Sequence, residues 1–279
     1  MTDIDATIQS TMVGALLARA VFSKAYPELL DDQKSSELIE RIKERTPDSE
    51  PEFAKAEQFI DEFIGLSLLS RAKIFDNAIR EFISKNPSAT VVNLGCGLDT
   101  TFSRVDNNKI KWYNLDLPDA IEYRRSLLPD SSRNICIPRS AFDYKWFEEV
   151  DFNQEKGIFF FAGGVFDYFE QKKIIELCKA MAERYPKGEL IFDATSKSGA
   201  RIINRRFRRV GAEGLNFRLA LKNPVKNIPK WSNRIELVDC LLGFGQTPRN
   251  PAWKRKTRIL MNICDRFHVF NYPHLRFLE

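Results

Sequence analysis

Apolar side chains recur at helical spacing through about the first 85 residues, a pattern that predicts a run of amphipathic helices. Pro27 ends the first helix, either Asp31 or Asp32 can cap the second, and Asn86-Pro87 follows the last. The apolar faces comprise Met12, Ala15, Leu16 and Ala20, then Leu38, Ile39 and Ile42, then Phe53, Phe59, Ile60, Phe63 and Ile64, and finally residues 68–84.

The pattern changes at Ala89, where short apolar runs begin to alternate with longer mixed segments. The predicted strands are residues 91–94, 112–115, 135–137, 158–161 and 190–192, and a helix is predicted at 171–184. Strands that alternate with helices form a parallel sheet with right-handed crossovers. Because these strands are almost continuously apolar, we expect both faces of the sheet to be covered.

The alternation stops at Thr195, after which come five arginines between positions 201 and 209 and a stretch rich in Gly, Pro and Lys. Residues 235–242 and 266–270 are predicted as two further strands that close the sheet. Seven strands after a helical region favour one elaborated α/β domain. Its parts would be a helical N-terminal region (1–87), a core (88–193), an insertion (194–234) and closing strands (235–279).

Composition places the chain among folded globular proteins, with 279 residues of which 43% are hydrophobic. It holds five cysteines and no Cys-x-x-Cys pair. We therefore expect a reduced, cytoplasmic protein without a disulfide framework or a metal site. Residues 1–9 hold two acids and no basic residue, and no long apolar run follows, so neither a signal peptide nor a membrane span is predicted.

Charge is distributed unevenly along the chain. The formal net charge is +5, but residues 194–279 hold 18 of the 43 Lys and Arg and only 5 of the 38 Asp and Glu, a net of +13. The first 193 residues therefore carry a net charge of −8. Nucleic-acid binding is not expected, because no stacking aromatics or known binding motif accompany the basic residues.

The strongest local signal is Gly95-Cys96-Gly97, directly after the first predicted strand. Glycines at such a position let a ligand approach the backbone closely. A dinucleotide fingerprint would need a third glycine at position 100, which here is Thr100, and pyrophosphate binding is therefore disfavoured. A tight structural turn is the competing explanation.

Acidic residues follow the next two predicted strands. Asp116 ends the second strand, where a carboxylate can accept both hydroxyls of a ribose, although the neighbouring Pro118 also suits a helix N-terminus. Asp143 lies beyond the third strand, where it would accept the adenine amine with Phe142 or Tyr144 against the ring. An ordinary loop aspartate is the alternative for Asp143. Together with the glycines, these acids indicate a nucleoside-containing cofactor.

The segments around the two glycines and Asp116 resemble motifs of a known family. Residues 93–100 (Asn-Leu-Gly-Cys-Gly-Leu-Asp-Thr) and 113–118 (Tyr-Asn-Leu-Asp-Leu-Pro) are similar to the S-adenosylmethionine-dependent methyltransferases of the leucine carboxyl methyltransferase family. Within it, the chain resembles the bacterial branch of tetracenomycin-type polyketide O-methyltransferases. Residues 70–73 and 274–277 also resemble family motifs.

The resemblance implies a class I methyltransferase fold. Such a fold would have a Rossmann-like, seven-stranded and mostly parallel sheet, an N-terminal helical extension, and a substrate cover inserted before the closing strands. Its cofactor would be S-adenosyl-L-methionine, with Asp116 on the ribose and Arg71 on the methionine carboxylate. A planar guanidinium suits bidentate carboxylate binding, and a helix-surface arginine is the alternative.

The cofactor-binding residues carried over by position form one larger set. They are Lys24, Arg71, Gly95, Gly97, Asp99, Asp116, Leu117, Phe142, Asp143, Tyr144, Ala162 and Gly163. Two positions depart from the family pattern: Gly163 stands where an acid is usual, and Thr101 where an arginine is frequent. The first change removes a partner for the amino group of the cofactor, so that Asp99 or a backbone carbonyl would have to compensate.

The expected activity is methyl transfer to a carboxylate or hydroxyl of a small anionic acceptor of polyketide-like type, free or bound to a carrier protein. Tyr168, Arg201 and Arg205 are the substrate-side candidates, with a solvated helix face as the alternative for the arginines. Only two histidines exist, which favours a carboxylate acceptor because it needs no general base. His274 is expected to be a packed or surface imidazole. No membrane partner is expected.

Three alternatives stay open. The first is a catalytically impaired or regulatory protein on the same scaffold. Gly163 leaves this alternative open, since a fold does not guarantee a chemical activity. A protein carboxyl group is a further acceptor to consider. A nicotinamide-dependent oxidoreductase is the third, and Thr100 argues against it.

Overall fold

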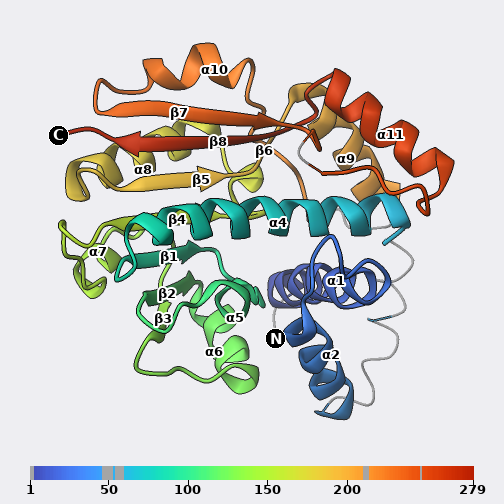
Figure 1. The fold of residues 1–279 in the computed structure, drawn as a ribbon, viewed down its shortest axis with the longest axis horizontal. Coiled ribbons are helices and arrows are strands. Elements are labelled where there is room, and N and C mark those ends of the chain that lie inside the picture. The colour runs from blue at the N-terminus through green and yellow to red at the C-terminus, as the bar shows by residue number, and fades with distance from the viewer. Residues whose placement is uncertain (1–2, 46–52, 54–59, 210–213, 246) are drawn as a thin grey trace.

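The computed structural model describes residues 3–45, 53, 60–209, 214–245 and 247–279. In this part of the chain an eight-stranded sheet has the order β3-β2-β1-β4-β5-β8-β6, with β7 paired to β8 (Figure 1). The strands are β1 Thr90–Leu94, β2 Lys111–Asp116, β3 Asn134–Pro138, β4 Ile158–Ala162, β5 Glu189–Phe192, β6 Ala194–Thr195, β7 Ile235–Leu242 and β8 Phe270–Phe277. Strands β1 to β5 pair in parallel, and β8 runs antiparallel to β5, β6 and β7. The mostly parallel α/β fold is confirmed, with the two-residue β6 as an additional strand.

The helices of the described ranges surround this sheet (Figure 1). They are α1 Asp3–Ala25, α2 Gln33–Arg45, α4 Glu62–Lys85, α5 Thr101–Val105, α6 Pro118–Leu127, α7 Trp146–Glu149, α8 Gln171–Arg184, α9 Lys197–Arg209, α10 Pro224–Asn227 and α11 Arg255–Arg266, with short 3-10 turns at Phe166–Tyr168 and Ile228–Lys230. None of these helices combines the length and apolarity needed to cross a bilayer.

Both faces of the sheet are buried, as the continuous apolar strands predict. Val91 packs with Phe75 and Ile79 of α4 on one face, whereas its neighbour Val92 belongs to the cluster around Leu177 of α8 on the other. Successive residues of a strand point to opposite faces, so a strand covered on both sides must be apolar throughout. Figure 1 shows α4 crossing in front of the sheet, with α8 behind it.

Two predicted boundaries are wrong. The third and fourth apolar stretches meet in one helix, since α4 begins at Glu62, capped by Asp61, and continues without a break to Lys85. A glycine inside it does not end the helix: a Cβ at Gly65 would lie 2.2 Å from the ring of Phe22, so the glycine serves close packing of α1 against α4. Residues 54–59 lie outside the described residues.

The predicted strand at 266–270 is the second wrong boundary. Arg266 is the last residue of α11, and β8 starts only at Phe270. The short apolar run spans the junction of the two elements, where His268 adopts a left-handed conformation (φ 47). Helix α11 buries Thr257 and Met261, which lie four residues apart, and such spacing is typical of a helix. The prediction overlooked this helical pattern because it considered only the short run 266–270.

Candidate active site

The site lies where β1 and β4 are neighbours in the sheet, since ligands of open α/β sheets bind beyond the carboxyl ends of strands at such a switch point. Gly95 (φ +67) and Gly97 (φ +42) follow β1 in the left-handed region that favours glycine. A Cβ at Gly95 would lie 2.2 Å from Val165, and one at Gly97 would lie 3.0 Å from Met12. Both positions therefore require glycine, because of the backbone conformation and because Val165 and Met12 pack directly against the turn.

Asp116 fixes this glycine turn. Its Oδ2 accepts the N–H of Gly97 at 2.7 Å, and its Oδ1 accepts the N–H of Leu117 at 2.8 Å. Burial raises the pKa of the Asp116 carboxyl, and the two backbone donors oppose that shift. Each carboxylate oxygen has a second lone pair. The geometry therefore leaves acceptor capacity for a diol such as that of a ribose.

Arg124 holds the same turn from α6. Its Nη1 donates to the carbonyl oxygens of Gly97 and Asp99, each at 2.8 Å. The carboxylate of Asp99 is engaged within its own loop, where it accepts the backbone N–H of Thr101 at 2.9 Å and the amide of Asn93 at 3.1 Å. These contacts hold Asp99 within the loop that follows the glycine turn.

A carboxylate does stand beside that position, and it comes from the neighbouring strand. Asp193, between β5 and β6, accepts the N–H of Gly164 at 2.7 Å through Oδ1. Its Oδ2 lies 3.0 Å from Nη1 of Arg71 on α4. Gly164 (φ +75) is required there, because a Cβ would lie 2.7 Å from the guanidinium. Gly163 has no room of its own, since its Cβ would lie 2.8 Å from the ring of Phe75.

Tyr168 and Asp167 complete this side of the site. Asp167 accepts the backbone N–H of Thr195 at 2.9 Å and its hydroxyl at 2.8 Å. Burial and the nearby Asp193 raise the pKa of Asp167. Burial also raises the pKa of Tyr168 to about 12, with Arg71 opposing the shift. Tyr168 is therefore a neutral phenol at pH 7, next to a guanidinium.

The insertion packs on the same residues. Asn204 of α9 accepts the N–H of Phe217 at 2.7 Å and donates to its carbonyl at 3.0 Å. The ring of Phe217 meets that of Tyr168 edge-on, with centroids 5.2 Å apart. The N–H groups of Arg218 and Leu219 donate to the carbonyl of Asp167. This segment thus covers Tyr168.

Some of the predicted site residues lie on the surface, away from the glycine turn and Tyr168. Arg201 and Arg205 lie on the exposed side of α9, away from the buried Ala200. Lys24 is exposed at the surface, 3.7 Å from Glu40. Asp143 pairs with Arg139 at 3.1 Å at the surface.

The remaining predicted residues stay near the strand ends. Ala162 is buried as the last residue of β4, and Leu117 is exposed at the start of α6. Phe142 packs edge-on against Phe169, and Tyr144 stacks on Phe147 with centroids 5.3 Å apart.

A buried ionic network underlies the glycine turn. Asp32 accepts from Arg19 at 3.1 Å and from Thr100 at 2.8 Å, and lies 2.9 Å from Arg104. Arg104 in turn makes two hydrogen bonds of 2.8 Å to Asp76. These contacts tie α1, the start of α2, α4 and α5 to the segment after Gly97.

The two acids of this network have opposite pKa shifts, although both pair with Arg104. Burial is the largest influence on each. For Asp32, Arg104 and Arg19 together outweigh it and lower the pKa to about 2. For Asp76, burial outweighs Arg104 and raises the pKa. The bidentate geometry of the Arg104–Asp76 pair nevertheless identifies Asp76 as a carboxylate in the folded protein.

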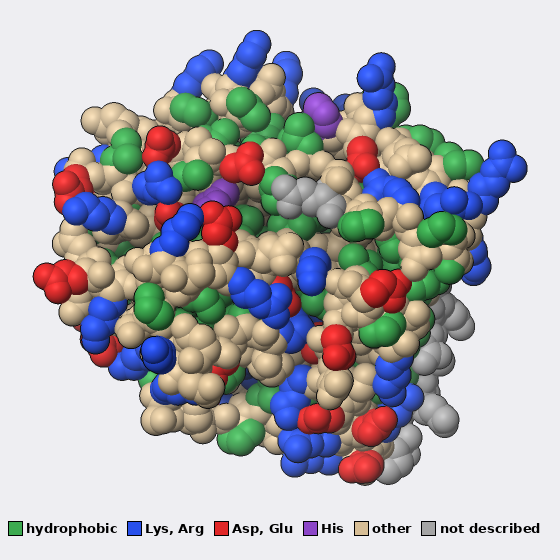
Figure 2. All heavy atoms as spheres, viewed as in Figure 1, with side chains coloured by type: hydrophobic (Ala, Val, Ile, Leu, Met, Phe, Trp, Pro, Cys, Tyr) green, Lys and Arg blue, Asp and Glu red, His purple; other side chains and the backbone are tan. Residues whose placement is uncertain are grey.

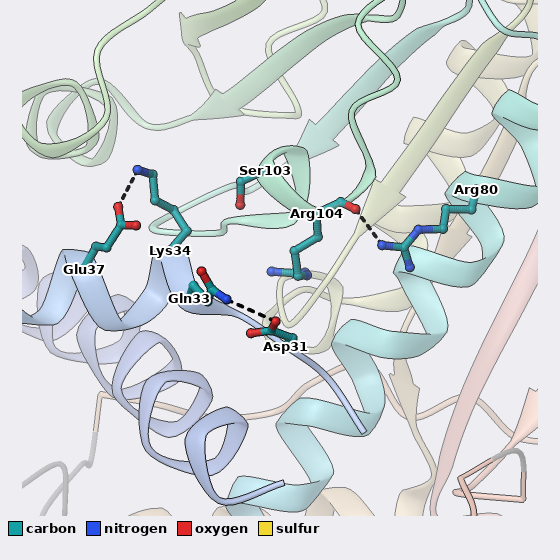
Figure 3. Close-up of a pocket in the computed structure, with 7 residues that line it drawn as sticks. All are labelled: Asp31, Gln33, Lys34, Glu37, Arg80, Ser103 and Arg104. Carbon is teal, nitrogen blue, oxygen red and sulfur yellow. Dashed lines mark hydrogen bonds and ion pairs between the residues drawn. The ribbon is translucent and has the colours of Figure 1, made fainter. Parts of the chain in front are cut away.

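A polar hollow of about 350 Å³ lies beside this network. Figure 3 shows its lining residues, with Arg80 reaching from α4 to the carbonyl of Arg104. Its lining residues are Asp31, Gln33, Lys34, Glu37, Arg80, Ser103 and Arg104. Neither the glycine turn nor Asp116 lines it. The hollow therefore lies outside the site at the strand ends.

Sequence reasoning missed Asp193, Arg124 and the Asp32 network. Asp193 directly follows a buried strand, which is the signal that identified Asp116, and it could have been found in the same way. The local pattern offered Asp32 only as a helix cap, and there it accepts the N–H of Ser35 at 3.2 Å. The ionic partners of Asp32 and the carbonyl partners of Arg124 carry no local signal, because they are distant in sequence.

Residues 12–182 match the family model described as "Leucine carboxyl methyltransferase". The chain belongs to the leucine carboxyl methyltransferase family. It is 25% identical over 218 residues to the tetracenomycin polyketide synthesis O-methyltransferase TcmP of Streptomyces glaucescens, which covers 78% of this chain and 76% of that protein. It is 22% identical over 280 residues to the S-adenosyl-L-methionine-dependent methyltransferase dpfgK of Gibberella zeae, covering 94% and 91%.

Solved structures agree on the methyltransferase fold. A duf574 family protein from Streptomyces avermitilis superposes with a TM-score of 0.60 at 11% identity, over 82% of this chain and 90% of that one. A protein from Thermobifida fusca, provisionally assigned as a methyltransferase, gives 0.58 at 15% identity, over 82% and 89%. Membership of the family makes this chain an S-adenosyl-L-methionine-dependent methyltransferase, as the sequence predicted.

The residues present fit that cofactor. The two positive-φ glycines form the tight turn after β1 that the cofactor would face, and the half-buried carboxylate of Asp116 keeps acceptor capacity for a ribose. Arg71 provides a guanidinium with N–H groups beyond the one given to Asp193, as a carboxylate ligand requires.

Proposed function

We propose that this methyltransferase is an O-methyltransferase whose small acceptor carries an oxygen already ionised at neutral pH, a carboxylate or an acidic phenol of polyketide-like type. The observation that carries the proposal is the absence of an imidazole beside Tyr168. Both histidines of the chain are described: His268 is exposed at the end of α11, and His274 of β8 contacts Glu189 at 2.8 Å. An ionised oxygen needs no base to remove a proton.

The chain's own residues would mainly bind and orient. When bound, S-adenosyl-L-methionine supplies a methyl group on a sulfonium. Asp116 would hold its ribose, the glycine turn would face its methionine moiety, and Arg71, aligned by Asp193, would hold its carboxylate. Tyr168, a neutral phenol, would donate a hydrogen bond on the acceptor side. The cover of Asn204 and Phe217 would exclude water, and most of the rate gain would come from positioning and from the local field.

Three further observations support the proposal. The polyketide O-methyltransferase TcmP is among the relatives, although 25% identity does not carry over its acceptor. Asp193 puts a carboxylate next to Gly163, which weakens the argument for an impaired scaffold. The basic C-terminal third favours an anionic acceptor, which would be attracted before it binds.

The atom that carries the transferred methyl group in the product tests the proposal. The protein would be incubated with methyl-labelled cofactor and a panel of aromatic carboxylic acids, phenols and amines. Transfer to oxygen is expected, and a methyl ester would release labelled methanol in mild alkali whereas an aryl methyl ether would not. Label found only on nitrogen, carbon or sulfur would refute O-methylation. Label found only on added proteins would favour the protein carboxyl alternative, and cofactor binding without any transfer would favour a regulatory role.

A further inference from the structure

Helix α11 has two apolar faces, and only one of them is packed. Its inner face buries Thr257 and Met261 against the core. Ile259, Ile263 and Phe267 lie four residues apart on its outer side and are 48%, 46% and 67% exposed. A surface helix normally buries its one apolar stripe, and a contiguous exposed stripe marks an interaction site.

The exposed stripe is flanked by basic side chains. Arg255, Lys256 and Arg266 are exposed on the same helix, and we call these three residues with Ile259, Ile263 and Phe267 the α11 face. The single acid of α11, Asp265, is occupied by Arg249 and by the N–H of Phe244. The α11 face therefore presents positive charge with no free carboxylate among it.

Helix α9 extends this surface. The N–H of Ser196, just before α9, donates to the carbonyl of Val269, just after α11, at 2.8 Å. Ile202 is 66% exposed on α9, between the exposed Arg201 and Arg205. Figure 1 shows the two helices at the same end of the molecule, and Figure 2 shows Lys and Arg side chains interspersed with apolar ones there.

We propose that the α11 face and the exposed side of α9 dock this protein on a membrane that contains anionic lipids. Protruding apolar side chains on a convex helix can enter the boundary between headgroups and acyl chains, where no shaped groove has to receive them. The guanidinium and ammonium groups around them pair with lipid phosphates, and a surface without free acids is not repelled. Such peripheral docking needs no spanning helix, which is why the absence of long apolar runs in the sequence did not predict it.

Docking at this place has a consequence for the site. The cover segment is fixed to α9 through Asn204 and Phe217, so the covered side of the active site would turn toward the lipid. An amphiphilic anionic acceptor would then enter from the membrane. This last step alone rests on the proposed function, whereas the docking surface does not.

Vesicle flotation of the full chain tests the docking surface without an activity assay. We expect binding to vesicles of phosphatidylcholine with phosphatidylglycerol, a loss of binding at high salt, and little binding to phosphatidylcholine alone. The double variant Ile263→Asp/Phe267→Ser should reduce the partition coefficient more than 10-fold. Arg255→Ser/Lys256→Ser should reduce it about 30-fold, since each basic residue contributes roughly a factor of five at an anionic surface.

Matched controls lie elsewhere on the surface. Leu278→Asp changes an exposed leucine near the C-terminus, and Lys172→Ser/Lys179→Ser removes two exposed lysines of α8. Both should bind vesicles as the unchanged protein does, and circular dichroism should show that all variants are folded. Equal binding to neutral vesicles, or equal effects of test and control variants, would overturn the proposal. So would α11 variants that still float but no longer bind an acidic protein partner.

Discussion

The guanidinium of Arg71 on α4 and the carboxylate of Asp193 beyond β5 lie 3.0 Å apart, 122 residues from each other in sequence. The same carboxylate holds the N–H of Gly164, so it links the helix before the sheet to the ends of β4 and β5. This pair puts an acid beside position 163, where the resemblance to the family leads one to expect an acidic side chain.

Asp193→Asn should weaken binding of S-adenosylhomocysteine by about 10- to 100-fold, because a hydrogen bond to a charged group contributes about 1.5–3 kcal/mol. Isothermal titration calorimetry measures the change. Asp239→Asn removes an exposed carboxylate of β7 and serves as control. Partial recovery is expected for Asp193→Glu, and an unchanged affinity in Asp193→Asn would remove Asp193 from the binding site.

Asp116→Asn should abolish most of the thermal stabilisation that S-adenosylhomocysteine gives. A ligand that binds only the native state stabilises it by RT ln(1 + L/Kd), where L is the free ligand concentration, and this quantity vanishes once Kd far exceeds L. The amide can still accept from Gly97 or Leu117, so the fold should persist. Asp119→Asn, in the first turn of α6, is the matched control. If both variants behaved alike, Asp116 would serve only as a helix and turn residue.

Gly163→Glu restores the family acid but should not improve cofactor binding. Its Cβ would lie 2.8 Å from the ring of Phe75, which packs on Phe161 and Tyr272, so the free energy of unfolding should fall by about 1–3 kcal/mol. Gly14→Ala, with nothing within 4 Å of the added Cβ, should be neutral or stabilising. Urea unfolding and calorimetry measure the two effects. If the missing acid limited cofactor binding, Gly163→Glu would bind S-adenosylhomocysteine more tightly and unfold at the same urea concentration as the unchanged protein.

The lowered pKa of Asp32 predicts that the folded protein loses stability in acid. Its folded pKa of about 2 lies below the ordinary value of 3.8, so it contributes stability above pH 4 that is lost as the pH falls from about 4 through 2. The difference corresponds to about 2 kcal/mol. Burial shifts the pKa of Asp76 in the opposite direction, so the contribution is isolated by comparing the unchanged protein with Asp32→Asn.

Urea unfolding at pH 6 and at pH 3 carries out this comparison. Asp32→Asn should be less stable at pH 6 and should lose less stability on acidification. Asp31→Asn changes the exposed neighbouring acid and should keep the acid sensitivity of the unchanged protein. Parallel losses in Asp32→Asn and the unchanged protein would contradict the assignment.

The cover should act on the acceptor and not on the cofactor. Asn204→Ala removes both hydrogen bonds to Phe217, so the cover over Tyr168 should loosen and KM for the acceptor should rise several-fold, since each bond contributes about 1 kcal/mol. Affinity for S-adenosylhomocysteine should be unchanged. Asn77→Ala, on an exposed position of α4, is the control, and a rise in cofactor Kd with unchanged KM would place Asn204 elsewhere in the mechanism.

The sequence by itself determined the elements whose signal is local. A buried strand needs apolar residues on both faces, which located β1, β2, β4 and β5, and two glycines directly after β1 indicated a tight turn there. Asp116 was identified because its position relative to its own strand carried the information.

Tertiary structure alone decided the contacts between distant residues. Arg71 and Asp193, or Asp32 and Arg104, meet only because the sheet order and the packing of α1, α2 and α4 bring them together. The outward position of Arg201 and Arg205 was also invisible, since helical spacing gives a shared face but not the side it points to. Where α11 ends and β8 begins depended on packing, because the short apolar run at the junction suits either element. A local pattern fixes periodicity, whereas the burial of each face and the pairing of each charge depend on which segments fold against it.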